Sequence, residues 1–162
     1  MNHLKRSVYL DSTIPSYLYD QRAELRVFVD LTRQWWNDRR DAYAVWVSEE
    51  TLAEVLAGEY PNKESVVAAV TQVPVLPFDE RIVDIARVYC DHHLMPQSEA
   101  GDAFHLAYAS FYRLDFLLTW NCNHLANANK QEHIRIINTR LGLFTPVVTT
   151  PLQLMGDPEH DA

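Results

Sequence analysis

The sequence has few of the features that mark secreted, disulfide-bonded or membrane proteins. Its 162 residues include two cysteines, Cys90 and Cys122, in no metal-binding or redox spacing, so we expect reduced thiols in a cytoplasmic protein. The apolar run near the N-terminus is too short for a signal peptide. No run approaches the ~20 apolar residues of a membrane-spanning helix. We expect one globular domain over residues 1–155 and an acidic, mobile tail over 156–162.

Basic residues are also scarce. The chain carries 14 Lys and Arg against 22 Asp and Glu, a net charge of −8. This charge disfavours tight nonspecific binding of nucleic acid, which depends on cationic side chains. Setting aside three acids of the tail and the three candidate metal ligands discussed below reduces the net charge to −2. The composition therefore still allows a metal-dependent enzyme that acts on RNA.

Short apolar strands alternate with amphipathic helices along the chain. We expect strands at 7–11, 42–47, 116–119 and 146–150, and a brief extended piece at 75–77. We expect helices that begin near Pro15 and lie at 24–39, 48–58, 61–73, 79–93, 99–112 and over most of 121–142. This alternation predicts an α/β fold, a three-layer α/β/α sandwich around a mostly parallel sheet.

Four polar side chains fall where such a sheet would bind a ligand, at the carboxyl ends of its strands. Asp11 closes the first strand, and Glu54 lies on the helix after the second. Asp102 opens the helix at 99–112, and Asn121 follows the third strand. Carboxylate and amide oxygens together suit Mg²⁺ or Mn²⁺. Such a cation would also offset the cost of placing a carboxylate at the end of a core strand.

Each of the four residues has an ordinary structural alternative. Asp11 could cap the helix that begins near Pro15, and Asp102 could complement a helix dipole. Glu54 could be a solvated helix residue, and Asn121 could cap the helix that follows it. For Glu54 and Asn121 taken singly, a structural role is favoured over a functional one. For each of the two Asp residues, the two roles are equally favoured. The ordered set of four favours a shared site.

Several polar and aromatic neighbours are assigned structural roles in preference to catalytic ones. An aromatic residue beside a strand end usually packs, a free cysteine is usually a small buried hydrophobe, and a histidine on a helix face is usually structural or solvated. The residues so assigned are Ser12 and Thr13 as turn residues, His105, Trp120, Cys122 and His124.

The ordered set resembles the PIN domain and, within that family, the VapC-type toxins of prokaryotic toxin–antitoxin pairs. The likeness extends over nearly the whole chain and is carried by VYLDSTIPSYL, VSEETLAEVL, GDAFHLAYA, LLTWNCNHLANA and VVTTPLQL. The acidic positions of the family fall on Asp11, Glu54 and Asp102. A fourth acid that many PIN domains carry is replaced here by Asn121.

The resemblance implies a metal-dependent endoribonuclease. Asp11, Glu54 and Asp102 would hold Mg²⁺ or Mn²⁺, with Asn121 completing the catalytic set, and a metal-activated water would attack the phosphodiester. The products would carry a 5′-phosphate and a 3′-hydroxyl. The resemblance further implies a single-stranded or looped RNA substrate, a small antitoxin partner and a homodimer, with no membrane association.

Two other functions are compatible with parts of the pattern. A phosphatase of the haloacid-dehalogenase kind also has an Asp after its first strand, but it needs a second acid two residues later, where this chain has Thr13. A PIN-fold module that binds RNA or a protein without cutting is the stronger rival. Asn121 and the acidic surface both allow it, whereas a pure scaffold gains nothing from three clustered acids.

Overall fold

The fold is seen in a computed structural model that describes residues 4–97, 100–123 and 125–156. Its centre is a sheet of four parallel strands in the order β2-β1-β3-β4. The strands are β1 (Ser7–Leu10), β2 (Ala44–Trp46), β3 (Phe116–Leu118) and β4 (Val147–Thr149). All four predicted strands are therefore present, and the piece predicted at 75–77 contributes a single bridge between Val75 and Val47.

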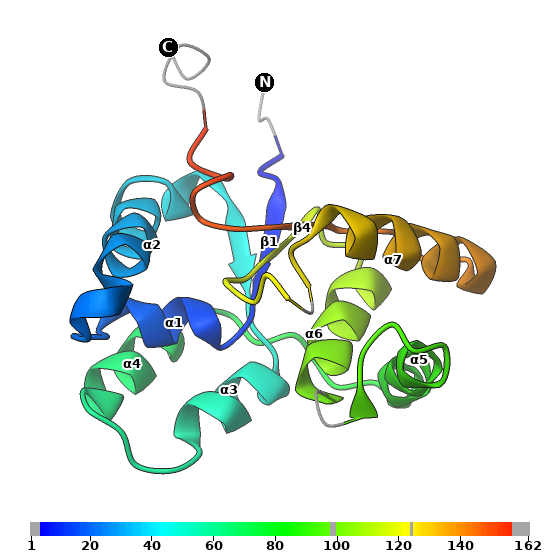
Figure 1. Ribbon diagram of the computed structural model, residues 1–162, viewed down its shortest axis with the longest axis horizontal. Helices are drawn as coiled ribbons and strands as arrows, with labels where there is room; N and C mark the ends of the chain where they lie inside the picture. The colour runs from blue at the N-terminus through cyan, green and yellow to red at the C-terminus, as the bar shows by residue number, and fades with distance from the viewer. Residues whose placement is uncertain (1–3, 98–99, 124, 157–162) are drawn as a thin grey trace.

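Helices cover both faces of this sheet (Figure 1), which confirms the predicted α/β architecture. The α-helices are α1 (Thr13–Leu18), α2 (Arg26–Asp38), α3 (Glu49–Leu56), α4 (Lys63–Val70), α5 (Glu80–Asp91), α6 (Ala100–Phe111) and α7 (Ala128–Leu141). Short 3₁₀ turns at Ala23–Leu25 and Arg40–Ala42 flank α2. None of the described helices is long and apolar enough to cross a membrane.

Two hydrophobic cores lie on the two faces of the sheet. Successive residues of a strand point to opposite faces, so Val8 and Leu10 of β1 join one core while Tyr9 joins the other. The first core packs against α1 to α4, and the second against α5 to α7. Strand β1 is buried on both faces because it lies inside the sheet between β2 and β3.

The helix predicted over most of 121–142 is α7 (Ala128–Leu141), which ends before Gly142 as expected. Helix α7 begins at Ala128, because the Asn127 side chain accepts a hydrogen bond from the Lys130 N–H (2.9 Å). The amide of Asn127 also donates to the carbonyls of Cys122 and Asn123. Asn127 therefore stabilises both an irregular loop and the helix N-terminus. This leaves Asn121 in the loop after β3, and not at a helix cap.

The acidic tail predicted for 156–162 falls almost wholly outside the described residues, which end at Gly156. The described chain closes with a turn after β4 that places Leu154 in the first core.

Candidate functional site

Asp11 is the buried centre of the candidate site. It follows β1 directly, and its backbone N–H donates to the Leu118 carbonyl at the end of the adjacent β3 (3.3 Å). Its side chain is 2% exposed. One carboxylate oxygen accepts hydrogen bonds from the backbone and hydroxyl of Thr13, and the other accepts from the Thr119 hydroxyl. Asp11 thus accepts from the first N–H of α1, although the N-cap residue of that helix is Ser12 and Asp11 precedes it.

Glu54 is held by a buried histidine from another helix. His105 Nε2 lies 2.8 Å from Glu54 Oε1, and the Ser12 hydroxyl donates to the other carboxylate oxygen of Glu54. His105 Nδ1 is hydrogen-bonded to the Tyr9 hydroxyl at 2.6 Å. Tyr9 in turn bonds Ser48, whose side chain caps α3. A continuous chain of hydrogen bonds therefore runs from the core of the sheet to the Glu54 carboxylate.

Asp102 and Asn121 face each other across the site. The side-chain amide of Asn121 donates to Asp102 Oδ2 (2.7 Å). The backbone N–H of Asn121 donates to the same Thr119 hydroxyl that donates to Asp11 (2.9 Å). Thr119 thereby links the loop after β3 to the end of β1. In this position Asn121 orients Asp102, a role that a carboxylate at the same place could not fill as a hydrogen-bond donor.

The carboxylates of Asp11, Glu54 and Asp102 all affect the pKa of His105. Burial raises the pKa of Asp11 above its ordinary 3.8, although His105 and the hydrogen bonds from Thr119 and Thr13 act in the opposite direction. Burial lowers the pKa of His105, but Glu54, Asp11 and Asp102 together raise it above 6.5. Burial raises the pKa of Glu54, but His105 and Ser12 bring it below 4.5. The raised pKa of His105 and the lowered pKa of Glu54 favour the charged forms of this pair, whereas burial disfavours the charged form of Asp11.

Two residues that the sequence analysis did not single out complete the surroundings of Glu54. Glu50 lies one turn earlier on α3; burial raises its pKa, His105 lowers it, and Glu54 raises it again, with a net upward shift. Gly101 lies close to both glutamates. A Cβ atom at this position would be 2.6 Å from Glu54 Oε1 and 3.4 Å from Glu50 Oε1. The missing side chain at position 101 is what lets Glu54 approach α6.

Gly101→Ala is expected to push Glu54 away from His105. The new methyl group would overlap a carboxylate that His105 and Ser12 hold in place, while Ala is favoured over Gly in a helix by about 1 kcal/mol. We expect a little-changed melting temperature and a lower pKa for the His105 imidazole, measured by NMR titration. Ala100→Ser, at the exposed preceding position, should leave that pKa unchanged. An unaltered His105 titration in Gly101→Ala would show that Glu54 adjusts without moving off the histidine.

The donor chemistry of the site fits a hard divalent cation, since it offers three carboxylates and an amide oxygen. The present side-chain arrangement is different. Within 4–97, 100–123 and 125–156, no three His, Cys, Asp or Glu side chains are placed to hold one ion together. Each carboxylate instead accepts hydrogen bonds from the protein. These bonds do not exclude an ion, because a carboxylate that binds a metal can still accept hydrogen bonds from neighbouring groups.

His105 is the main functional candidate that sequence reasoning demoted. His105 follows Asp102 by three residues, so both lie on one face of α6. This spacing is the feature of the sequence that could have indicated a place for His105 in the site. Its bond to Glu54 joins residues 51 positions apart, which no local pattern reveals. Ser12 was taken as a turn residue, and it also donates to Glu54.

Trp120 packs as expected, and it also adjoins the site. Its ring lies 5.1 Å from Phe28 and 6.4 Å from Tyr17, centroid to centroid. The indole N–H donates to the Thr32 hydroxyl (2.7 Å), and the backbone N–H donates to the Thr13 hydroxyl.

Cys122 in the same loop is exposed, and His124 lies outside the described residues.

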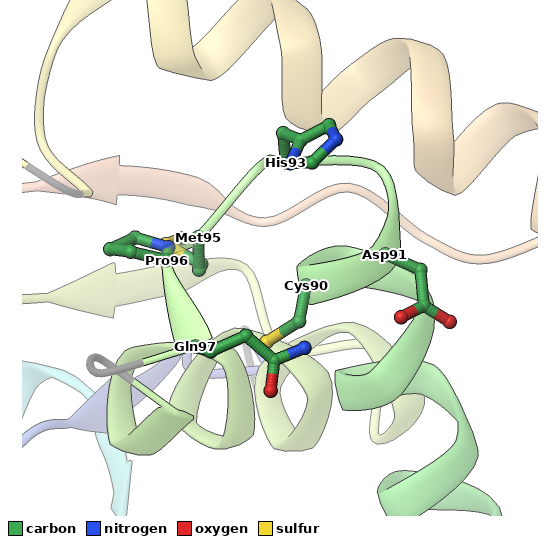
Figure 2. Close-up of a pocket in the computed structure, with 6 residues that line it drawn as sticks. All are labelled: Cys90, Asp91, His93, Met95, Pro96 and Gln97. Atoms are coloured by element: carbon green, nitrogen blue, oxygen red, sulfur yellow. The ribbon is translucent and has the colours of Figure 1, made fainter.

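A separate hollow of about 410 Å³ lies at the C-terminal end of α5. Figure 2 shows the six side chains that line it: Cys90, Asp91, His93, Met95, Pro96 and Gln97. None of them is a candidate site residue, and burial raises the pKa of the Cys90 thiol and so disfavours the reactive thiolate. The carboxylates around His105, and not this hollow, therefore form the candidate functional site.

A model of the PIN domain matches residues 8–129, a span that includes all three acids and Asn121. The chain belongs to the PIN domain family. The resemblance drawn from the sequence is thereby confirmed for the family. PIN domains are generally nucleases. A search of curated proteins found no match.

Two solved structures share the PIN fold of this chain. One is a toxin–antitoxin complex from Klebsiella pneumoniae, with 19% identity and a TM-score of 0.58 over 89% of this chain and 97% of that chain. The other is VapBC2 from Rickettsia felis bound to a DNA fragment from their promoter, with 12% identity and a TM-score of 0.52 over 89% and 98%. At these identities the likeness concerns the fold.

Proposed function

We propose that this PIN protein is a metal-dependent endoribonuclease and the toxin of a toxin–antitoxin pair. The observation that carries the proposal is the set of Asp11, Glu54 and Asp102 around His105, at the carboxyl edge of a parallel sheet. Carboxylates brought together at a ligand-binding edge have a cost that a structural role does not explain. The nuclease character of the family supports the same conclusion.

Asp11, Glu54 and Asp102 would hold Mg²⁺ or Mn²⁺, which when bound supplies an activated water and neutralises charge on the phosphate. The residues of the chain position these ligands. Thr13 and Thr119 fix the Asp11 carboxylate through hydrogen bonds to both of its oxygens. His105 fixes Glu54, and Asn121 fixes Asp102.

The proposed partners follow from chemistry and from the structural relatives. The substrate is single-stranded or looped RNA, because an unpaired backbone can reach a recessed carboxylate site. Both solved relatives come from complexes with antitoxins, so we propose a small antitoxin for this chain too, whose cationic side chain would pair with the acidic site. We further propose a homodimer that acts in the cytoplasm.

A non-catalytic PIN module that binds RNA or protein is the second candidate. The observation in its favour is that, in the part of the chain that the structure describes, no three ligand side chains are placed to hold one ion. The two functions differ in one property, since a catalytic site must bind a divalent cation and a scaffold need not.

The test is cleavage of a structured RNA pool with Mn²⁺, comparing the wild type, Asp102→Asn and an EDTA control. Asp84→Asn, which removes an acid from the exposed face of α5, is the matched control for charge. We expect cutting by the wild type and Asp84→Asn, and none by Asp102→Asn or with EDTA. Cutting that persists in Asp102→Asn would refute the site. A wild type that neither cuts nor binds Mn²⁺ would establish the scaffold.

A further inference from the structure

A cleft of about 700 Å³ opens beside Glu54. It lies between the C-terminal ends of α1 and α3 and the connection from α3 to α4, three segments that lie together in Figure 1. Its volume falls within the range of small-molecule sites. The lining side chains that matter here are Ser16, Tyr19, Gln21, Arg22, Glu54 and Tyr60.

The ring of Tyr60 is fixed on one wall of this cleft. Its hydroxyl donates to the Val55 carbonyl at 2.6 Å, so the hydroxyl already has a protein partner. The ammonium group of Lys63 lies 5.9 Å from the ring centroid. Because the hydroxyl is engaged, the group that Tyr60 offers to a ligand is its aromatic ring.

Tyr19 also lines the cleft, and the segment that carries it is joined to the segment that carries Tyr60. The side-chain amide of Asn62 donates to the Tyr19 carbonyl at 3.0 Å, and Asn62 follows Tyr60 by two residues. This bond holds the end of α1 against the connection that carries Tyr60. The backbone segments that carry these two half-buried tyrosines are therefore held together before any ligand arrives.

The charges of the cleft disfavour a phosphate as its occupant. Asp20 accepts hydrogen bonds from Arg22 at both carboxylate oxygens, the shortest of them 2.7 Å, and these bonds hold the pKa of Asp20 below its usual range. Arg22 is the one cation among the described residues that line the cleft, and it is already neutralised. Glu54 adds negative charge. A neutral aromatic group suits this cleft better than an anion.

We infer that this cleft binds one base of a single-stranded RNA, beside the phosphodiester that the carboxylates would cleave. The base would stack on Tyr60 and Tyr19, because every base offers a π-face to an aromatic ring. Ser16 and Gln21 supply hydroxyl and amide groups for the base edge, which an unpaired nucleotide exposes. Glu54 lines both the cleft and the acidic site, so a bound base fixes the adjoining backbone. The inference rests on the proposed ribonuclease function.

The test measures binding of fluorescent rA, rC, rG and rU hexamers by anisotropy in EDTA, where cleavage plays no part. Tyr60→Leu removes the ring, and Tyr60→Phe keeps it. Tyr112→Leu is the matched control, because the Tyr112 hydroxyl also donates to a backbone carbonyl at 2.6 Å, at Pro77 and away from the cleft. We expect a preference among the four hexamers, and a binding loss of about tenfold in Tyr60→Leu. Tyr60→Phe and Tyr112→Leu should bind as the wild type does.

Several results would overturn the base site without touching the proposed nuclease. They are undetectable binding of all four hexamers by the wild type, or equal binding by Tyr60→Leu and Tyr112→Leu. Unchanged RNA binding in Tyr60→Leu with weakened binding of an antitoxin would assign the cleft to a protein partner instead. Conversely, RNA that binds through Tyr60 but is never cut with Mn²⁺ would refute the nuclease and leave the base site standing.

Discussion

Asp11→Asn is expected to abolish RNA cleavage without weakening the fold. The substitution removes a charge whose burial is unfavourable, as the raised pKa of Asp11 shows. The Asn carbonyl can still accept from Thr13, and the Thr119 hydroxyl can turn to accept from the Asn amide. We expect activity to fall at least about 100-fold. The free energy of unfolding should drop by no more than about 1 kcal/mol, and it should rise if relief of the buried charge dominates.

The pH dependence of this variant gives a second check, made in EDTA. A carboxyl group with a raised pKa in the folded state binds its proton more tightly there than in the unfolded chain. The folded wild type therefore gains stability as the pH falls through that raised pKa toward 3.8, and Asp11→Asn does not. Any stability advantage of the variant should shrink on acidification, measured by urea unfolding at several pH values. An advantage that grows as the pH falls would contradict a buried, charged Asp11.

Divalent cations should stabilise the wild type more than Asp11→Asn. An ion that binds only the folded state adds about 2.7 kcal/mol of stability at 100 times its dissociation constant. Mn²⁺ should raise the melting temperature of the wild type, and it should raise that of Asp11→Asn much less. Asp84→Asn, with its exposed acid removed, should respond as the wild type does. Equal shifts in all three proteins would place the ion elsewhere.

His105→Leu is expected to cost both stability and activity. It leaves Tyr9 its bonds to Ser48 and Thr51 but removes the donor that holds Glu54. Hydrogen bonds to charged groups are worth more than neutral ones, so we expect a loss of about 2–4 kcal/mol. Cleavage should fall through a lower kcat with little change in KM, because the residue acts on Glu54 and not on RNA. His105→Gln, which can still donate to Glu54, should recover part of both.

The stability lost in His105→Leu should itself depend on pH. The pKa of His105 is raised, so the stability it contributes is complete below about 6.5 and is lost as the pH rises through its folded pKa. The pKa of Glu54 is lowered, so its contribution is present above about 4.5 and lost as the pH falls. The deficit of the variant should therefore be greatest between these values and decline at alkaline pH. A deficit that is flat with pH would mean that His105 acts by packing alone. The exposed His92, changed to Gln, is the control.

Local patterns were sufficient for most of the architecture. The apolar strand at Ser7–Leu10 and the capping signal at Ser48 are encoded by neighbouring residues, and both are found in the structure. The exact start of α7 was not predicted, because Asn127 bonds the backbone of its own loop, and such side-chain bonds compete with helix formation over a few residues. The spacing of apolar residues along the sequence gives no information about such side-chain bonds.

The candidate site, like the fold, was predictable from the sequence only in part. Asp11, Asp102 and Asn121 could be named in advance because each lies near the end of a strand or the start of a helix, and Glu54 because it completes the ordered set, although their catalytic roles remain predictions. The hydrogen bonds that hold these residues could not be predicted. The bonds from Thr119 to Asp11 and from His105 to Glu54 connect distant parts of the sequence. Gly101 is a similar case, since its role is to leave room for a side chain from another helix.

The pairing of β1 with β3 also bears on when the protein becomes active during its synthesis. Asp11 emerges from the ribosome early, but its partners Leu118 and Thr119 follow more than 100 residues later. Contacts between such distant segments form late in folding. A nascent chain that lacks β3 has the first acid without the residues that orient it. The candidate site can therefore be completed only after β3 has been synthesised and has paired with β1.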